Sequence, residues 1–241
     1  GMGVLYLEKH APWVATAFTT HATVLGRSIA GNNRPLYSRL KEFNPVQTAH
    51  EFNVTSKQSL EKISAQVADV FTSVSEITGR ECEAFLGKKT DVITPNGFED
   101  TFVPAPENFD AARRAAREKL LSVAQALLGY DLPADTLLVS TSGRYEYRNK
   151  GIDLFLSSLG EVNRKTDSNR QCVAFILVPA YHKGPRQDLA AALASGTRLT
   201  DGDKYLTHGL DYVNDDPVMN QLIKEVIHNI SSEYVKVIFV P

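Results

Sequence analysis

The sequence alternates short, continuous apolar runs with longer segments of helical periodicity, and this alternation limits the folds available to the chain. The run at 171–178, QCVAFILV, lacks polar alternation, which is typical of a strand covered on both faces of a parallel sheet. Parallel strands need long crossover connections, and the segments between the runs are long enough to supply them. The predicted strands are residues 13–20, 69–74, 91–94, 136–140, 171–178 and 235–240.

Helical stripes fill the segments between these strands. Gly129 is the expected end of one helix, and Asp216 with Pro217 is the expected start of another. The first of these helices has an apolar face of Ala116, Leu120, Val123 and Leu127. The second has an apolar face of Leu222, Ile223, Val226, Ile227 and Ile230. Further helices are predicted from Leu60, Ile63 and Val67, over 76–86, and over 152–162.

Together these patterns predict an α/β fold in which helices flank parallel sheets. The least periodic stretch, 97–108, contains Pro104 and Pro106 and is the predicted hinge between two Rossmann-like units. The predicted domains are residues 1–103 and 104–241. Ligands of such sheets bind at the carboxyl ends of strands, so the residues that follow the strands are the first candidates for chemistry.

Charge and cysteine content exclude several classes of function. The 26 basic and 28 acidic residues leave a net charge of -2, which gives no field for nucleic acid or an anionic membrane. The longest apolar stretch, 172–179, is far shorter than the roughly 20 residues of a membrane-spanning helix. Cys82 and Cys172 lack metal-ligand spacing, which favours free thiols in a reducing compartment. We therefore expect a cytoplasmic protein with no metal site and no cofactor.

The first candidate site follows the strand predicted at 13–20. His21 comes directly after that strand, and Gly26 and Arg27 are expected in the loop beyond it. A histidine there can donate to a sugar hydroxyl, or its backbone carbonyl can stabilise developing positive charge, and an arginine can hold a phosphate. The alternative is a histidine that bonds a loop and an arginine that packs on a helix.

The second candidate is Asn96–Gly97, in DVITPNGF at 91–98. This pair is common in tight turns and means only a turn when taken alone. It gains interest from its place between the two predicted units, where the floor of a cleft would lie.

The third and strongest candidate is the segment 140–155, STSGRYEYRNKGIDLF. Gly143 follows a predicted strand, and Arg144 and Lys150 bracket the loop that leads into a helix at Ile152. Helix N-termini favour anions, and a planar guanidinium with an ammonium can neutralise a diphosphate without a metal. The alternative is a solvated basic loop. The segment has neither a Walker motif nor a GxGxxG fingerprint.

Six stretches together resemble the glycogen synthases of family-3 glycosyltransferases from animals and fungi. In chain order they are AFTTHATVLGR, ADVFTSVSEIT, DVITPNGF, SGRYEYRNKGIDLFLSSLGEVN, VAFILVPA, and DPVMNQLI with SSEYVKVIFVP. The resemblance implies a GT-B fold, in which two Rossmann-like domains face each other across a cleft. It implies transfer of glucose from UDP-glucose or ADP-glucose to the non-reducing end of an α-1,4-glucan such as glycogen, with retention of configuration.

The resemblance also implies roles for the candidate residues. His21 is the catalytic residue beside the donor glucose, and Arg27 lies near the sugar diphosphate. Asn96 and Gly97 line the cleft at the domain junction. The remaining substrate-binding residues lie in the third segment: Gly143, Arg144, Glu146 and Lys150.

Two parts of the family pattern are not found in this sequence. The glycine-rich donor loop would precede Gly1, and the motif with the catalytic glutamate would follow Pro241. We therefore expect the chain to be the middle of a longer enzyme, and to be inactive or nearly so by itself. Residues 183–210 replace a longer helical insertion of the family, which leaves the oligomeric state open. Two other functions remain: another GT-B enzyme such as an α-glucan phosphorylase, or a non-catalytic module that binds nucleotide or glucan.

Overall fold

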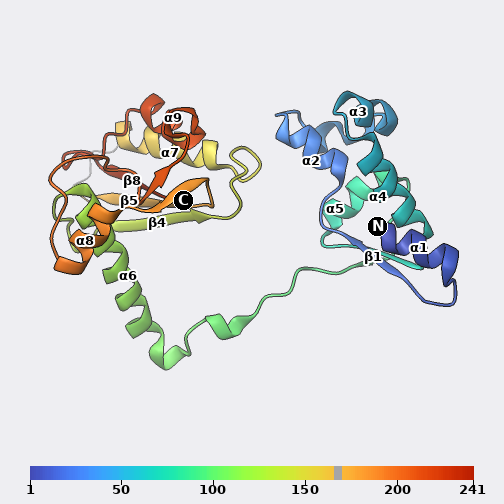
Figure 1. Cartoon of the computed structure of the whole chain (residues 1–241), viewed down its shortest axis with the longest axis horizontal. Helices are drawn as coiled ribbons and strands as arrows, with labels where there is room; N and C mark the ends of the chain where they lie inside the picture. Colours follow the sequence, from blue (N-terminus) through green and yellow to red (C-terminus); the bar gives the residue numbers. More distant parts are fainter. Residues whose placement is uncertain (166–169) are drawn as a thin grey trace. The chain divides into compact units, whose positions relative to one another are not determined.

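The computed structural model describes residues 1–165 and 170–241, which form two compact units, Gly1–Asp100 and Thr101–Pro241. Both are built from parallel strands flanked by helices (Figure 1), so the predicted α/β class is confirmed. The assignment of the units to successive domains of a longer enzyme stays a prediction. Within the described residues, no helix combines the length and apolarity needed to cross a membrane.

Unit 1 contains a parallel sheet of order β1-β2-β3. Helices α4 and α5 make most of the contacts among its helices. Its strands are β1 (Ala17–Thr20), β2 (Val70–Ser73) and β3 (Val92–Ile93). Its helices are α1 (Met2–His10), α2 (Val24–Gly31), α3 (Pro45–Glu51), α4 (Thr55–Val67) and α5 (Glu76–Leu86), with a 3₁₀ helix at Tyr37–Glu42. The core is small, and Phe71 and Phe85 are its largest fully buried side chains.

Unit 2 is a parallel sheet of order β4-β5-β8 with an antiparallel β6-β7 pair beside it. Its strands are β4 (Leu137–Ser142), β5 (Cys172–Leu177), β6 (His182–Pro185), β7 (His208–Leu210) and β8 (Val235–Val240). Its helices are α6 (Pro106–Leu128), α7 (Ile152–Lys165), α8 (Gln187–Ser195) and α9 (Pro217–Lys224), with a 3₁₀ turn at Val213–Asp215. A further 3₁₀ turn, Asp100–Phe102, begins at the last residue of unit 1.

Helices cover both faces of the unit 2 sheet, with α7 and α9 on one face and α6 and α8 on the other (Figure 1). Successive side chains of β5 point to opposite faces. Ala174 therefore packs with the α7–α9 layer, and Phe175 packs with the α6–α8 layer. This explains the absence of polar alternation in the β5 sequence, because neither face of the strand meets water.

Several boundaries agree with the sequence patterns. Helix α5 has the predicted bounds, and α6 ends at Gly129, whose positive φ of 86° is a left-handed cap. The Asp216 carboxylate accepts the backbone N–H groups of Val218 and Met219 at the start of α9, and Pro217 is the first helical residue.

Other predictions were wrong in ways that have a physical cause. The strand predicted at 13–20 begins only at Ala17, and Trp13 is 80% exposed in the turn before it. Helix α9 ends at Lys224, and the chain turns through a positive φ at Val226. Of the predicted apolar face, Leu222 and Ile227 are buried, whereas Ile223 and Ile230 are exposed. These apolar patterns matched strand and helix periods without a facing layer to bury them.

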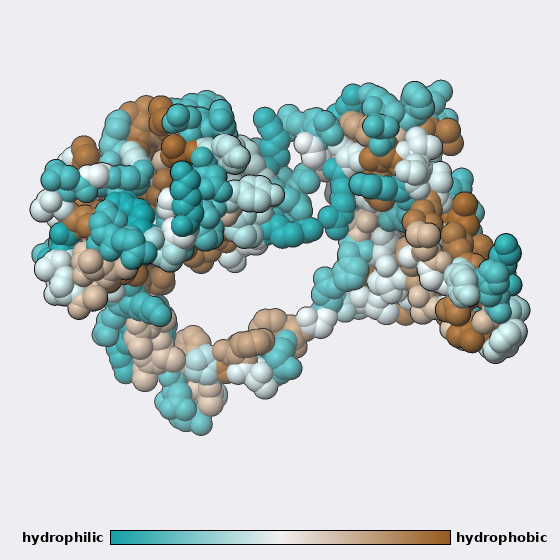
Figure 2. All heavy atoms as spheres, in the orientation of Figure 1, coloured by the Kyte–Doolittle hydropathy of each residue, from teal (hydrophilic) through white to brown (hydrophobic). Residues whose placement is uncertain are grey.

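Two further corrections concern α4 and the predicted hinge. In α4 the buried residues are Gln58, Ser64 and Ala65, whereas Ile63 is 46% exposed. Pro106 is the first residue of α6, which suits a residue without a backbone N–H, so the irregular stretch is shorter than 97–108. Exposed apolar side chains lie along this stretch and appear as brown atoms in Figure 2, and Phe98 and Phe102 are 80% and 82% exposed.

Candidate functional site

The loop 143–151 joins the carboxyl end of β4 to α7, as the strand-to-helix pattern predicts. Gly143 has a φ of 148°, a conformation that glycine tolerates, and its N–H donates to the carbonyl of Leu177 at 3.3 Å. A Cβ added at Gly143 would lie 3.9 Å from Cδ and Cε of Lys150, so the lysine stem passes over this glycine. The fold therefore brings Lys150 back beside the residue that precedes Arg144.

Arg144 and Lys150 are both exposed, which suits groups that receive a ligand from solvent. Arg144 Nη2 lies 3.1 Å from Glu146 Oε1, and the two side chains are 62% and 31% exposed. An ion pair this exposed contributes little to stability, on the order of 0–1 kcal/mol, but it restricts where the guanidinium points. Among the described residues, no hydrogen bond or ion pair holds the Lys150 ammonium. The structure thus groups Gly143, Arg144, Glu146 and Lys150 in one loop.

Tyr145 anchors this loop to the body of unit 2. Its hydroxyl donates to Asp216 Oδ2 at 2.8 Å, and its ring packs edge-on against Phe239 with centroids 5.8 Å apart. Burial raises the pKa of the Tyr145 hydroxyl well above its usual value, and the bond to Asp216 adds to the effect, so the hydroxyl remains a neutral donor. Sequence reasoning missed this role. The alternation in RYEYR was the available signal, because it places the tyrosines on one side of the loop and charges on the other.

In unit 1, His21 follows β1 as predicted and is exposed. Gly26 and Arg27 do not lie in a loop, which corrects the prediction, because α2 already begins at Val24. The Thr23 side chain caps this helix by accepting the Gly26 N–H at 2.9 Å. Gly26 is buried and Arg27 is exposed. His21 therefore lies in the β1–α2 connection, and Arg27 lies in the first turn of the helix that follows it.

Two carboxylates, the half-buried Glu61 and the buried Glu81, were missed in the sequence and hold this connection in place. Glu61 accepts the Val24 N–H and the Thr20 hydroxyl, each at 2.9 Å. Glu81 accepts the hydroxyls of Thr23 at 2.8 Å and Tyr37 at 2.7 Å. Carboxylates are favourable at a helix N-terminus because its free N–H groups carry partial positive charge. Burial is the main cause that raises the pKa of Glu61. The partners of both carboxylates lie 37 to 58 positions away in the sequence, so no local pattern marked them.

Asn96 and Gly97 lie in an extended, exposed segment after β3. The expected tight turn is absent at these residues, and Gly97 does not have a positive φ. A Cβ at Gly97 would meet no atom within 4 Å. Nothing within unit 1 therefore requires the NG pair for folding.

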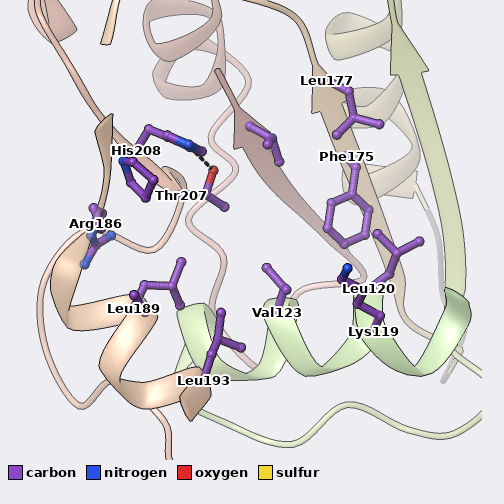
Figure 3. A pocket seen from close by; sticks show the side chains of 13 residues that line it. Lys119, Leu120, Val123, Phe175, Leu177, Arg186, Leu189, Leu193, Thr207 and His208 are labelled. Carbon is purple, nitrogen blue, oxygen red and sulfur yellow. Dashed lines mark hydrogen bonds between the residues drawn. The ribbon is translucent and has the colours of Figure 1, made fainter. Parts of the chain in front are cut away.

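A cavity of about 330 Å³ lies between α6, α8 and the sheet of unit 2 (Figure 3). The Thr207 hydroxyl and His208 Nδ1 are paired at 2.9 Å, and Arg186 is held by Asp188 at 2.6 Å. The rest of the lining is mainly apolar: Leu120, Val123, Phe175, Leu177, Leu189 and Leu193. This cavity does not offer the converging free donors that a diphosphate needs, so the loop 143–151 remains the candidate site. In the part of the chain that the structure describes, no three His, Cys, Asp or Glu side chains could share a metal ion.

Comparison with known proteins decides the family. The family model described as glycogen synthase matches residues 1–188. The chain belongs to the glycogen synthase family. It is 37% identical to the glycogen [starch] synthase of Caenorhabditis elegans over 191 residues, which cover 75% of this chain and 28% of that protein. It is 40% identical to the enzyme of Dictyostelium discoideum over 188 residues, 74% of this chain and 21% of that protein.

The liver glycogen [starch] synthase of Rattus norvegicus is similar at 36% identity over 187 residues, 75% of this chain and 26% of that protein. The chain thus spans about a quarter of the length of the curated glycogen synthases that it matches. The predicted resemblance to glycogen synthases is confirmed, and the matched residues include both strand-to-helix connections described above.

Proposed function

We propose that this chain forms part of a retaining glycosyltransferase of GT-B type. It moves glucose from a nucleotide-glucose, UDP-glucose or ADP-glucose, to the non-reducing end of an α-1,4-glucan such as glycogen. The observation that carries the proposal is the loop 143–151, which places two exposed cations, Arg144 and Lys150, at the carboxyl end of a parallel strand. Membership of the glycogen synthase family supports the synthase over an α-glucan phosphorylase.

In this proposal Arg144 and Lys150 bind the diphosphate of the donor. Glycosyl transfer leaves a nucleoside diphosphate that gains negative charge as the bond to glucose breaks. Fixed cations near that charge stabilise the transition state more than the ground state, and this lowers the barrier. Gly143 lets the backbone approach the ligand, and Glu146 orients the guanidinium through their 3.1 Å ion pair.

The unit 1 residues complete the proposed site. His21, directly after β1, lies beside the donor glucose, where it donates to a hydroxyl or offers its carbonyl to developing positive charge. Arg27 adds a cation for the diphosphate. Asn96 and Gly97 are further substrate-binding residues of the proposal. Glu61 and Glu81 bond residues 20, 23 and 24, beside and between His21 and Arg27, and this is the feature of unit 1 that favours the role.

The test is titration calorimetry of UDP and of ADP with the wild-type chain and three variants. Arg144→Ala and Lys150→Ala each remove one charge-assisted contact and should weaken binding by about 1.5–3 kcal/mol, roughly 10- to 150-fold in Kd. Arg148→Ala is the matched control, because it removes an exposed arginine from the same loop and should leave Kd within about twofold. Equal losses in all three variants would reduce the loop to a general electrostatic effect, and unchanged affinity in Arg144→Ala would overturn its assigned role. The nucleotide that binds more tightly identifies the donor base.

A further inference from the structure

A second, smaller cavity of unit 2 lies next to the loop 143–151 and has a volume of about 140 Å³. Three tyrosines from three segments line it: Tyr145 from the loop after β4, Tyr181 from the segment after β5, and Tyr212 from the segment before α9. The Asp211 N–H donates to the Tyr181 carbonyl at 3.2 Å, which ties the last two segments together. The cavity is therefore built from connections at the same end of the sheet as the cationic loop.

Two of these tyrosines are exposed to an extent that packing does not explain. Tyr181 is 84% exposed and Tyr212 is 70% exposed, although tyrosine rings usually bury most of their surface. Tyr145 differs, because its ring packs on Phe239 and its hydroxyl is paired with Asp216. The walls of the cavity thus present two free aromatic faces beside one fixed ring.

The charged side chains that line the cavity are two carboxylates, Asp215 and Asp216. Asp216 is fully engaged, because its carboxylate accepts two backbone N–H groups and the Tyr145 hydroxyl. Asp215 also lines the cavity and is exposed, and within residues 1–165 and 170–241 no side-chain partner holds its carboxylate. A free carboxylate accepts hydrogen bonds from hydroxyl groups and repels an anion. A neutral ligand with several hydroxyls fits this chemistry, and a phosphate does not.

Size narrows the ligand further. Pockets that bury drug-sized ligands run to about 300–1,000 Å³, so 140 Å³ accommodates a single ring and not a nucleotide. A pyranose has an apolar face that stacks on an aromatic ring and a rim of hydroxyls that donate to a carboxylate. We propose that this cavity binds one glucose unit of the α-glucan, with Tyr181 and Tyr212 as stacking rings and Asp215 as acceptor. This inference rests on the proposed function, from which it takes glucose as the sugar.

The cavity would hold the glucan beside the donor. Tyr145 joins the two sites, because it contributes to the wall of the cavity and directly follows Arg144 in the chain. A glucan held here stays near the diphosphate loop between transfers, and this raises the effective concentration of acceptor ends.

Isothermal titration of the full chain with maltoheptaose tests the proposal. Wild type should bind, and Tyr181→Ala and Tyr212→Ala should each weaken binding about tenfold by removing a stacking face. Tyr6→Ala is the matched control, since Tyr6 is also an exposed tyrosine, 63%, but lies on α1 in unit 1. Thermal melting checks that each variant is folded. We expect both tyrosine variants to fold, because the two rings are largely exposed and their removal leaves no cavity in the core.

The same variants are titrated with UDP and with tetramethylammonium chloride. The affinity for UDP should be unchanged in Tyr212→Ala. If the wild-type chain binds maltoheptaose but not UDP, the diphosphate assignment is refuted, whereas the sugar cavity is not. Absence of maltoheptaose binding in wild type, equal affinity in Tyr212→Ala, or binding of tetramethylammonium in place of the sugar would each overturn this inference. The last outcome would identify a site for an organic cation, which aromatic faces with a carboxylate also suit.

Discussion

Substituting the same residue at two helical glycines of unit 1 should have opposite effects on stability. Gly3 lies on α1 and Gly26 lies on α2. Alanine is a better helix former than glycine by about 1 kcal/mol, because glycine loses more backbone freedom on folding. A Cβ at Gly3 would meet no atom within 4 Å, so Gly3→Ala should stabilise the chain by about 0.5–1 kcal/mol.

At Gly26 the gain in helix propensity is outweighed by a clash. The added Cβ would overlap the carboxylate of Glu81 and lie 2.8 Å from Thr23 Oγ1. Glu81 is only 3% exposed and cannot turn into solvent without leaving its bonds to Thr23 and Tyr37. Two hydrogen bonds to a charged group contribute about 1.5–3 kcal/mol each. After subtraction of the gain in propensity, we expect Gly26→Ala to destabilise unit 1 by about 2–5 kcal/mol.

Urea unfolding followed by circular dichroism measures both variants against wild type. Hydrogen exchange of residues 20–31, resolved by mass spectrometry, locates the loss, which should concentrate in α2 and in the β1–α2 connection. If Gly26→Ala is as stable as Gly3→Ala, the carboxylate does not pack on Gly26 as described, and the proposed support of His21 and Arg27 fails with it.

Two further predictions concern the anchor of the cationic loop and a buried acid. Tyr145→Phe keeps the ring but removes the 2.8 Å bond to Asp216, so the unfolding free energy of unit 2 should fall by about 1.5–3 kcal/mol and UDP should bind more weakly; unchanged urea midpoint and unchanged Kd would contradict the anchoring role. Burial raises the pKa of Glu61 above 4.5, which means that the folded state holds this proton more tightly than the unfolded state. Its contribution to stability is therefore complete below pH 4.5 and is lost as the pH rises through the raised pKa. The difference in urea midpoint between wild type and Glu61→Gln, followed from pH 4 to pH 7, should change in that direction, and a difference that stays constant would show that Glu61 titrates normally.

Local sequence patterns predicted a helix or strand well where the apolar residues of that element also form its buried face. Strand β5 was recognised because both of its faces meet helices, and the end of α6 because Gly129 caps it. The predicted apolar face of α6 was only partly right, since Leu127 is buried whereas Ala116 and Leu120 are exposed. The loop 143–151 was found because glycine and basic residues between a strand and a helix have few structural reasons to occur together. In each case the signal lies within about 20 consecutive residues.

The supports of the candidate site could not be found in this way. Glu81 holds Thr23 across 58 positions, and Tyr145 reaches Asp216 across 71, so no local period links the partners. The exposed rings around the small cavity are equally hidden, because an isolated tyrosine has the same sequence signature whether it is buried or exposed. Ile223, Val226 and Ile230 show the reverse error, since they fit a helical period with the buried Leu222 and Ile227 but are themselves exposed.

By itself the sequence determined the α/β class, the helix caps, the cationic loop and the family, because each depends on neighbouring residues or on an ordered set of short motifs. The tertiary structure alone decided which carboxylates are buried beneath the β1–α2 connection, how the loop after β4 is anchored, and where free tyrosine faces surround a cavity. The physical reason is that burial and hydrogen-bond partnership depend on contacts between distant segments. Those contacts exist only after the sheets have assembled.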